Sequence, residues 1–197
     1  MSMTKLEAVN RILEAIGEDP VSSLKSGLSD AETAERFLDR TSKQIQRRGW
    51  HCNTEHNLRL IPDNQGYILL PSNTLKVDSV GKSRHIDVVK RGKRLYERRK
   101  KTFIFNQPIF VEIILELPWD DLDYALQDFI SALAAQKYQA SVMGSVALDQ
   151  TFTSRDVQEA WIALLENEAD NEDTNIIDYS LMGRDIARRN TSPRRGL

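Results

Sequence analysis

Few residues in this 197-residue chain could carry out catalysis, and they do not converge on one site. His51 and His56 flank the single cysteine, Cys52, a combination that could supply metal ligands or a thiol nucleophile activated by histidine. Five positions of extended chain separate the two histidines, however, so their imidazoles would point to opposite faces. We therefore expect neither a catalytic site nor a metal site.

The sequence also gives little support for a catalytic pair of carboxylates or for a phosphate-binding loop. Glu32, Glu55, Glu112 and Glu116 are candidates for a glycosidase-type acid pair, but nothing in the sequence brings two of them to the required separation. The sequence has no GxxxxGKS/T loop, no GxGxxG after an expected strand and no GxSxG, the motifs that bind phosphates or carry a nucleophilic serine. We expect a protein that is not an enzyme.

The strongest local signal is a basic segment between residues 82 and 101, where ten cations face only two acids. These cations are Lys82, Arg84, Lys90, Arg91, Lys93, Arg94, Arg98, Arg99, Lys100 and Lys101. They could follow a nucleic-acid backbone without reading bases, or they could meet an acidic protein surface. The acidic run from Glu166 to Asp173 is such a surface within the same chain. Opposite poles on one protomer favour heterologous contacts, which close into rings.

Composition limits the alternatives. The net charge of −2, from 27 Lys and Arg against 29 Asp and Glu, argues against a uniformly basic nucleic-acid binder. A single cysteine cannot form an internal disulfide, which is typical of a chain made in a reducing compartment. No stretch approaches the roughly 20 apolar residues of a membrane span, and the N-terminus lacks the apolar core of a signal peptide. We expect a soluble protein that neither enters a membrane nor is exported by a cleavable signal.

Two amphipathic helices are expected before residue 50. Thr4 and Glu7 have the spacing of a capping box and open a first helix that ends before Gly17. Ser29 and Glu32 repeat that spacing and open a second, longer helix. Both segments carry apolar residues at three- and four-residue intervals, so each is expected to bury one face.

Gly49 and Trp50 mark the junction where helix gives way to extended chain. Gly49 is expected to close the second helix because glycine adopts the left-handed conformation that commonly follows a helix. We expect Trp50 to be structural, burying its ring between the helices and the segment that follows.

Two further helices are expected after residue 118. Asp120 or Asp121 is expected to cap the first, which has a wide apolar face between Leu122 and Val142. Thr153 or Ser154 opens the second. Its expected buried side consists of Val157, Trp161, Leu164 and Leu165.

Between these helical halves, residues 51–117 contain seven short apolar or alternating runs separated by turn residues. That spacing is typical of antiparallel strands in a meander or small barrel. The predicted fold class is therefore α+β, a bundle of about four helices with an inserted antiparallel β domain. Residues 1–50 and 118–175 would form the bundle, 51–117 the insert, and 176–197 an extended C-terminal arm.

The expected arm has an apolar part followed by arginines. The apolar side chains are Ile176, Ile177, Tyr179, Leu181 and Met182, and the arginines are Arg184, Arg188, Arg189, Arg194 and Arg195. Such a segment buries too little surface to order itself, so we expect a partner to hold it. Because the apolar residues come first and the arginines follow, the segment could dock in a groove of a partner and then pair bidentately with its carboxylates.

Several short motifs occur in a distinctive succession over the first 62 residues. They are Ala8-Val9-Asn10, Ile12-Leu13, Ile16-Gly17-Glu18, Pro20-Val21-Ser22-Ser23-Leu24, Gln44-Ile45-Gln46, Arg48-Gly49-Trp50, Asn53, Glu55 and Leu60-Ile61-Pro62. This succession resembles the tail tubular protein A family of short-tailed, autographivirus-type bacteriophages. The last two helices, with Tyr138, Gly144 and the acidic run, match more loosely, and the β segment is not recognisable.

The resemblance implies a head-to-tail adaptor, or gatekeeper, of the virion tail, made in the host bacterial cytoplasm. It implies a ring of twelve copies between the portal protein and a nozzle protein of the tail tubular protein B type. Genomic DNA would pass through the ring without sequence-specific contacts during ejection. The resemblance implies no cofactor, and no motif supports carrying over the glycan degradation suggested for some members.

In related connector proteins the helical bundles build the ring, the C-terminal arm grips the portal and the β part faces the tail. Carried over, the portal-binding residues are Tyr179, Leu181, Met182, Arg184, Arg188, Arg189, Arg194 and Arg195, although these arginines depart from the less basic ends of the family. The basic residues Arg84, Lys90, Arg91, Lys93, Arg94, Arg98, Arg99, Lys100 and Lys101 would contact another subunit or the nozzle. The alternative is a nucleic-acid-binding module that uses residues 82–101.

Overall fold

The computed structural model describes residues 2–25, 27–143 and 154–189, with the backbone alone at 143 and 172–189. The elements are α1 (Lys5–Glu14), α2 (Ser29–Gln46), the 3-10 turn η1 (His51–Asn53), β1 (Thr54–Leu60), β2 (Thr74–Ser79), η2 (Gly81–Ser83), β3 (Val88–Arg91), β4 (Arg94–Glu97), β5 (Ile109–Leu115), η3 (Trp119–Asp121), α3 (Tyr124–Met143) and α5 (Ser154–Arg189). Four helices and antiparallel sheets confirm the predicted α+β class.

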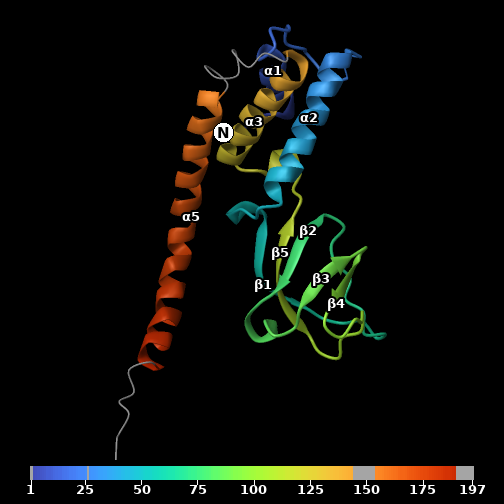
Figure 1. The fold of residues 1–197 in the computed structure, drawn as a ribbon, viewed down its shortest axis with the longest axis vertical. Helices are drawn as coiled ribbons and strands as arrows, with labels where there is room; N and C mark the ends of the chain where they lie inside the picture. Colours follow the sequence, from blue (N-terminus) through green and yellow to red (C-terminus); the bar gives the residue numbers. More distant parts are fainter. Residues whose placement is uncertain (1, 26, 144–153, 190–197) are drawn as a thin grey trace, which may run out of the picture.

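The helices form one end of the molecule. α1 and α2 pack against α3, and the first turns of α5 cover another side of α3 (Figure 1). The fully buried side chains at the centre include Ile12, Leu38, Leu126, Ile130 and Leu164, one or two from each helix. The apolar periodicity of these segments therefore meets in a single core.

The two predicted capping boxes have different outcomes. The first is confirmed: Glu7 N–H donates to Thr4 Oγ1 at 3.2 Å and Thr4 N–H donates to Glu7 Oε2 at 2.7 Å. The prediction for α2 is wrong, because Leu28 is the N-cap and Ser29 is already the first helical residue. The Ser29 carbonyl instead accepts a hydrogen bond from Thr33 Oγ1 at 2.8 Å.

The predicted cap of α3 is also wrong. Asp120 and Asp121 lie in the 3-10 turn η3, which breaks before the helix begins. Asp123 takes the capping role, since its Oδ1 accepts the backbone N–H of Leu126 at 2.8 Å. A carboxylate at this position also faces the positive end of the helix dipole.

The β insert, residues 51–117, contains two small sheets. One has the order β1-β5-β2, all antiparallel, and the other is the β3–β4 hairpin. The meander expectation is wrong because β5 returns between β1 and β2. Two of the seven predicted strands, 67–70 and 102–105, contribute only isolated bridges, Leu69 to Arg94 and Thr102 to Glu97. A second apolar cluster, with Leu95, Val111 and Ile113 at its centre, fills the insert.

Helix α5 is longer than the sequence pattern predicted. It continues through the acidic run to Arg189 and extends past the bundle alongside the β insert (Figure 1). No proline or glycine interrupts the sequence from Ser154 to Met182, which allows the helix to continue. The residues assigned to the arm from Tyr179 to Arg189 are helical in backbone, whereas Arg194 and Arg195 lie outside the described residues. None of the helices in the described part is both long and apolar enough to cross a membrane.

Candidate interaction surfaces

Trp50 lies where the bundle meets the β insert. Its side chain is 6% exposed and belongs to the apolar cluster of the bundle. The indole Nε1–H donates to the Ile45 carbonyl at 3.0 Å, and the ring meets Trp161 of α5 edge-on at 6.0 Å between centroids. Trp161 in turn packs on Phe129 of α3. The aromatic contacts therefore connect the end of α2 to both later helices.

A pair of buried amides ties the chain together where it leaves and re-enters the bundle. Gln46 Oε1 accepts the N–H of Leu117 at 2.7 Å, and its Nε2 donates to the Leu117 carbonyl at 3.2 Å. Asn53 Nδ2 donates to the carbonyls of Gln46 and Leu115, while its Oδ1 accepts the Trp50 N–H. These amides satisfy backbone hydrogen-bonding groups around the end of α2 and the end of β5. Gln46 belongs to the Gln44-Ile45-Gln46 motif, but nothing in the sequence indicated these contacts because Leu117 lies 71 positions further along the chain.

His51 joins three elements at the same junction. Its Nδ1 lies 2.5 Å from Glu168 Oε1 of α5, and its Nε2 lies 3.2 Å from Asp123 Oδ2 at the start of α3. Glu168 also accepts the backbone N–H of His51 at 3.2 Å, and Asn167 donates to Asp123 Oδ2 at 3.2 Å. This junction cluster fastens α5 to the entrance of the β insert.

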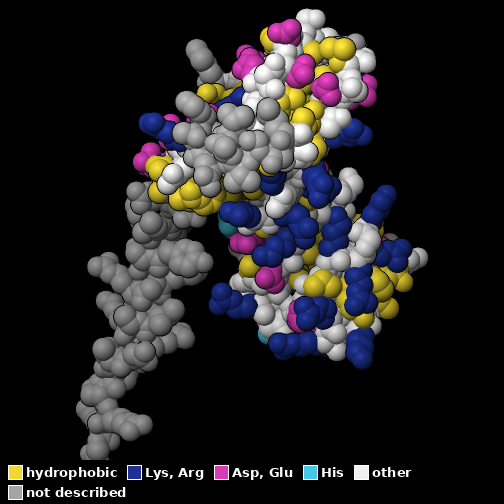
Figure 2. Space-filling view, turned by 45° about the horizontal axis from the view of Figure 1, so that its top comes forward, with side chains coloured by type: hydrophobic (Ala, Val, Ile, Leu, Met, Phe, Trp, Pro, Cys, Tyr) yellow, Lys and Arg dark blue, Asp and Glu magenta, His cyan; other side chains and the backbone are white. Residues whose placement is uncertain are grey.

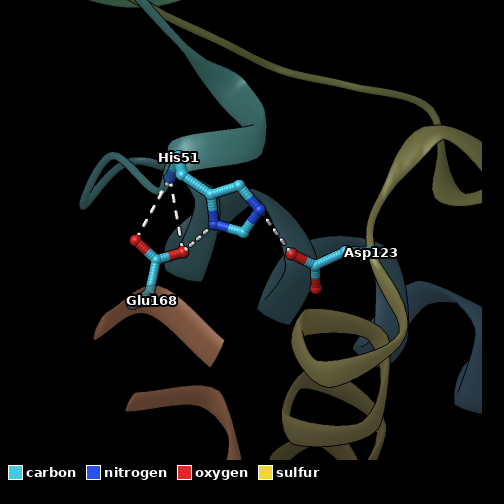
Figure 3. A group of neighbouring side chains, drawn as sticks. All are labelled: His51, Asp123 and Glu168. Carbon is cyan, nitrogen blue, oxygen red and sulfur yellow. Dashed lines mark hydrogen bonds and ion pairs between the residues drawn. The ribbon is translucent and has the colours of Figure 1, made fainter. Parts of the chain in front are cut away.

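The junction cluster also supplies three groups that can ligate metals. His51, Asp123 and Glu168 each offer one ligand atom, all within 4.8 Å of one another. The imidazole lies between the two carboxylates, however, and contacts them through nitrogens on opposite sides of the ring (Figure 3). One ion bound to all three would require the ring to turn away. The geometry therefore favours a histidine bridge between two carboxylates over a metal centre.

The cysteine beside this cluster, Cys52, lies in surroundings that disfavour its thiolate. Burial, together with the nearby negative charges of Asp123 and Glu168, raises the pKa of the Cys52 thiol to about 11. A thiol with a raised pKa is a poor nucleophile near neutral pH. His56 is paired elsewhere, with Glu112 at 2.9 Å on the surface of the insert. His51 and Cys52 therefore both lie beside the carboxylates of Asp123 and Glu168.

The basic segment spreads over the β3–β4 hairpin and the turns beside it. Lys and Arg side chains gather over the insert, with apolar areas between them, in the face shown in Figure 2. The guanidinium of Arg91 lies 3.7 Å from the Tyr96 ring centroid, and that of Arg94 lies 4.2 Å from that of Tyr67. Lys90 differs from the others because its Nζ donates to the Thr74 carbonyl within the insert.

The other basic side chains of this segment are exposed. They are Lys82, Arg84, Arg91, Lys93, Arg94, Arg98, Arg99, Lys100 and Lys101. Arg98 approaches Asp87 at 3.5 Å and Lys100 approaches Glu97 at 3.4 Å, so two of the charges are partly offset. The remaining cations give the insert an excess of exposed positive charge.

A hollow of about 490 Å³ opens beside Glu97 in the insert. The carboxylate is largely buried, and the hollow is otherwise lined by apolar side chains, Thr102, two amides and the Lys100 that approaches Glu97. Hydrolysis of a glycosidic bond needs a second carboxylate at a defined separation. Glu97 is the one carboxylate among these lining residues.

The comparison with known families identifies the chain. A family model described as tail tubular protein matches residues 6–174, most of the sequence. The chain belongs to the tail tubular protein family. It is also 28% identical over 137 residues to Tail tubular protein A of Klebsiella phage KP34, covering 69% of this chain and 72% of the relative.

Membership of the tail tubular protein family makes this chain a structural component of the bacteriophage virion tail. The family match includes both helical halves and the β insert, and thus the junction cluster and the basic segment. It ends before residue 176, where the expected arm begins.

Proposed function

We propose that this protein forms the ring-shaped adaptor between portal and tail nozzle, and that the genome leaves through its lumen. The ring would contain twelve identical copies. Its partners would be neighbouring copies, the portal protein, a nozzle protein of the tail tubular protein B type and the passing DNA. The proposed role is structural, without cofactor or catalysis.

The distribution of charge between the two halves of the molecule carries this proposal. The β insert has 12 Lys and Arg against 7 Asp and Glu, whereas the rest of the chain has 15 against 22. A near-neutral protein is therefore divided into a positive and a negative part. Such bipolar protomers attract one another head to tail, and a heterologous contact closes into a ring when its rotation divides the full turn evenly.

The aromatic and polar junction supports an adaptor for a mechanical reason. A ring between two larger bodies must keep its parts in fixed relative positions while DNA passes. Trp50, Gln46 and His51 each connect elements of the bundle to the start or end of the insert. Buried hydrogen-bonded networks of this kind rigidify the structure around them.

The C-terminal residues would fasten the ring to the portal. The proposed portal-binding side chains are the apolar and arginine residues from Tyr179 onward. Deleting Gly183–Leu197 should leave the protein folded, because the described core involves no side chain beyond Leu164. The truncated protein should no longer join portal-containing heads. If the truncated protein attached normally and gave infectious particles, the portal contact would have to lie on the bundle.

A nucleic-acid-binding module remains the second candidate, because exposed arginines on the insert could follow phosphates. A phosphate binder loses affinity for duplex DNA steeply as salt rises. Absence of measurable binding to duplex DNA at low salt would exclude this candidate.

The adaptor role is tested with heads assembled in the absence of this protein. Purified protein is added, followed by the nozzle protein, and tail attachment is scored by electron microscopy. We expect nozzles on portal vertices only when this protein is present. Nozzles that attach equally well without it would overturn the adaptor role.

A further inference from the structure

One surface of the β insert exposes apolar side chains among its cations. Leu69 pairs with Arg94 across the isolated bridge, so both side chains point to the same side, with Tyr67 two residues away under the Arg94 guanidinium. Leu69 is 64% exposed and Ile104 is 51% exposed. Ile104 is directed over Gly66, where an added Cβ would lie 2.7 Å from its Cγ2. We name Tyr67, Leu69, Arg94 and Ile104 the outer β face.

A second surface, on α5, has the opposite charge and a similar apolar centre. Ile162 is 50% exposed and Leu165 is 45% exposed, which corrects the prediction that Leu165 is buried. Together with Ala169 they follow one another at intervals of three and four residues on the side of the helix that faces away from α3. Exposed Glu166 flanks them. We name these four residues the outer α5 stripe.

The two surfaces lie on opposite edges of the protomer. α5 forms one edge and the β3–β4 hairpin the other, with the three-stranded sheet between them (Figure 1). A ring of identical copies brings one edge of each protomer against the opposite edge of the next. An apolar patch with a positive rim therefore meets an apolar patch with a negative rim.

We propose that the outer β face of one copy docks on the outer α5 stripe of its neighbour, an inference that rests on the proposed ring. Interfaces commonly consist of an apolar centre that excludes water and a polar rim that sets orientation and partner. Arg94 and Glu166 are the rim charges of opposite sign. DNA fits the outer β face less well, because phosphates would leave Leu69 and Ile104 in water.

Disulfide cross-linking in assembled particles tests this contact. The variant Leu69→Cys/Ile162→Cys is loaded onto portal-containing heads, oxidised and run on a non-reducing gel. A heterologous contact gives a ladder that extends beyond dimers, because each copy carries two different linking sites. The single variants Leu69→Cys and Ile162→Cys are the controls and should give monomers, which also checks that the native Cys52 does not react.

Charge reversal supplies an independent measurement. Arg94→Glu and Glu166→Arg should each lower the fraction of heads that carry the protein by about tenfold. The double variant should recover to within about twofold of the unmodified protein. Lys25→Glu makes the same change in net charge as Arg94→Glu at an exposed position of the connector between α1 and α2, outside the β insert, and should have no effect.

The outcomes separate this inference from the adaptor role. If the unmodified protein occupies the heads but the cysteine pair gives no ladder and the charge swap gives no rescue, the docking contact is wrong and the adaptor role stands. Loss with Arg94→Glu that Glu166→Arg does not rescue would assign the outer β face to the nozzle or to DNA. If the unmodified protein never binds the heads, both proposals fail.

Discussion

The helical bundle and the β insert differ in what their charged side chains contact. In the bundle, Lys5 pairs with Glu35 at 2.8 Å and Arg11 pairs with Asp128 at 2.6 Å, so cations of one helix meet acids of another. In the insert, Arg91 and Arg94 lie over aromatic rings and most of the remaining cations point into solvent. Several charges of the bundle pair with one another across helices, whereas most cations of the insert have no such partner among the described residues and are available to another molecule. Stability and binding should therefore respond to mutations in different regions.

The largest loss of stability is expected at Trp50, at the junction of the two regions. Trp50→Ala removes a buried ring and should lower the free energy of unfolding by about 3–5 kcal/mol. For a protein of this size each kcal/mol shifts Tm by about 2–4 °C. Thermal unfolding measures the change, with Trp50→Phe as the conservative control. An unchanged Tm would make Trp50 an interface anchor instead of a structural residue.

Substitution of Gly49 measures how closely the insert packs against the end of α2. Its φ is +83°, and an added Cβ would lie 2.8 Å from Ile114 Cδ1 and 3.2 Å from Thr54 Oγ1. Gly17 is the matched control because its φ is +80° with nothing within 4 Å of the added Cβ. Gly17→Ala should cost about 1–2 kcal/mol from backbone strain alone. Gly49→Ala should cost at least about 1 kcal/mol more, from the clash with Ile114.

Urea unfolding of both glycine variants provides the measurement. Equal losses of stability would mean that the first residues of β1 and the end of β5 shift without cost. The insert would then be less firmly attached to the bundle than the junction contacts indicate.

Two histidines each pair with a carboxylate, one at the junction and one on the surface of the insert, so removing each in turn compares the stability that the two sites contribute. His51→Ala leaves the largely buried Glu168 without its closest partner and should destabilise by about 1–3 kcal/mol. His56→Ala removes an exposed pair with Glu112 and should cost no more than about 1 kcal/mol. Amide hydrogen exchange should show faster exchange in the first half of α5 for the His51 variant alone. Similar exchange in both variants would remove His51 from the attachment of α5.

A cation of the insert should matter for binding and not for folding. Arg99 is exposed, and Arg99→Glu should change the free energy of unfolding by less than about 0.5 kcal/mol. Urea unfolding is the measurement, with attachment to heads scored in parallel. A large loss of stability would show that the cations of the insert contribute to its folding.

The smallest expected effect concerns the reactivity of Cys52. A folded-state pKa of about 11 lies above that of an ordinary thiol, so at pH 8 the folded protein has less thiolate than the unfolded chain. Alkylation by iodoacetamide should therefore be slower in the native protein than in urea, and should accelerate as the pH rises toward 11. Equal rates in the two states at pH 8 would contradict the buried position of the thiol.

The sequence predicted the fold class because helical and strand periodicities act locally. The same locality explains the errors. Asp123 and Asp120 are equally plausible caps in the sequence, and only the 3-10 turn at residues 119–121 decides between them. The central position of β5 depends on pairing with β1 and β2, residues far away in the chain.

The junction could not be predicted from residue types alone. His51 is 117 positions from Glu168, and no spacing rule connects them. Leu165 fits an apolar helical stripe as well as Leu164 does, yet Leu164 is buried and Leu165 is half exposed because α3 covers one side of α5 only. The basic segment was visible in the sequence, but its apolar neighbours Leu69 and Ile104 join it only through the isolated bridge and the turn at Gly66.

The central claim is that bipolar protomers close into a ring at the portal. Size-exclusion chromatography with light scattering, performed on the protein alone and with purified portal, tests this most directly. We predict that the portal complex gains the mass of twelve chains. A portal whose mass is unchanged in the presence of excess protein, or a gain of only one or two chains, would contradict the account.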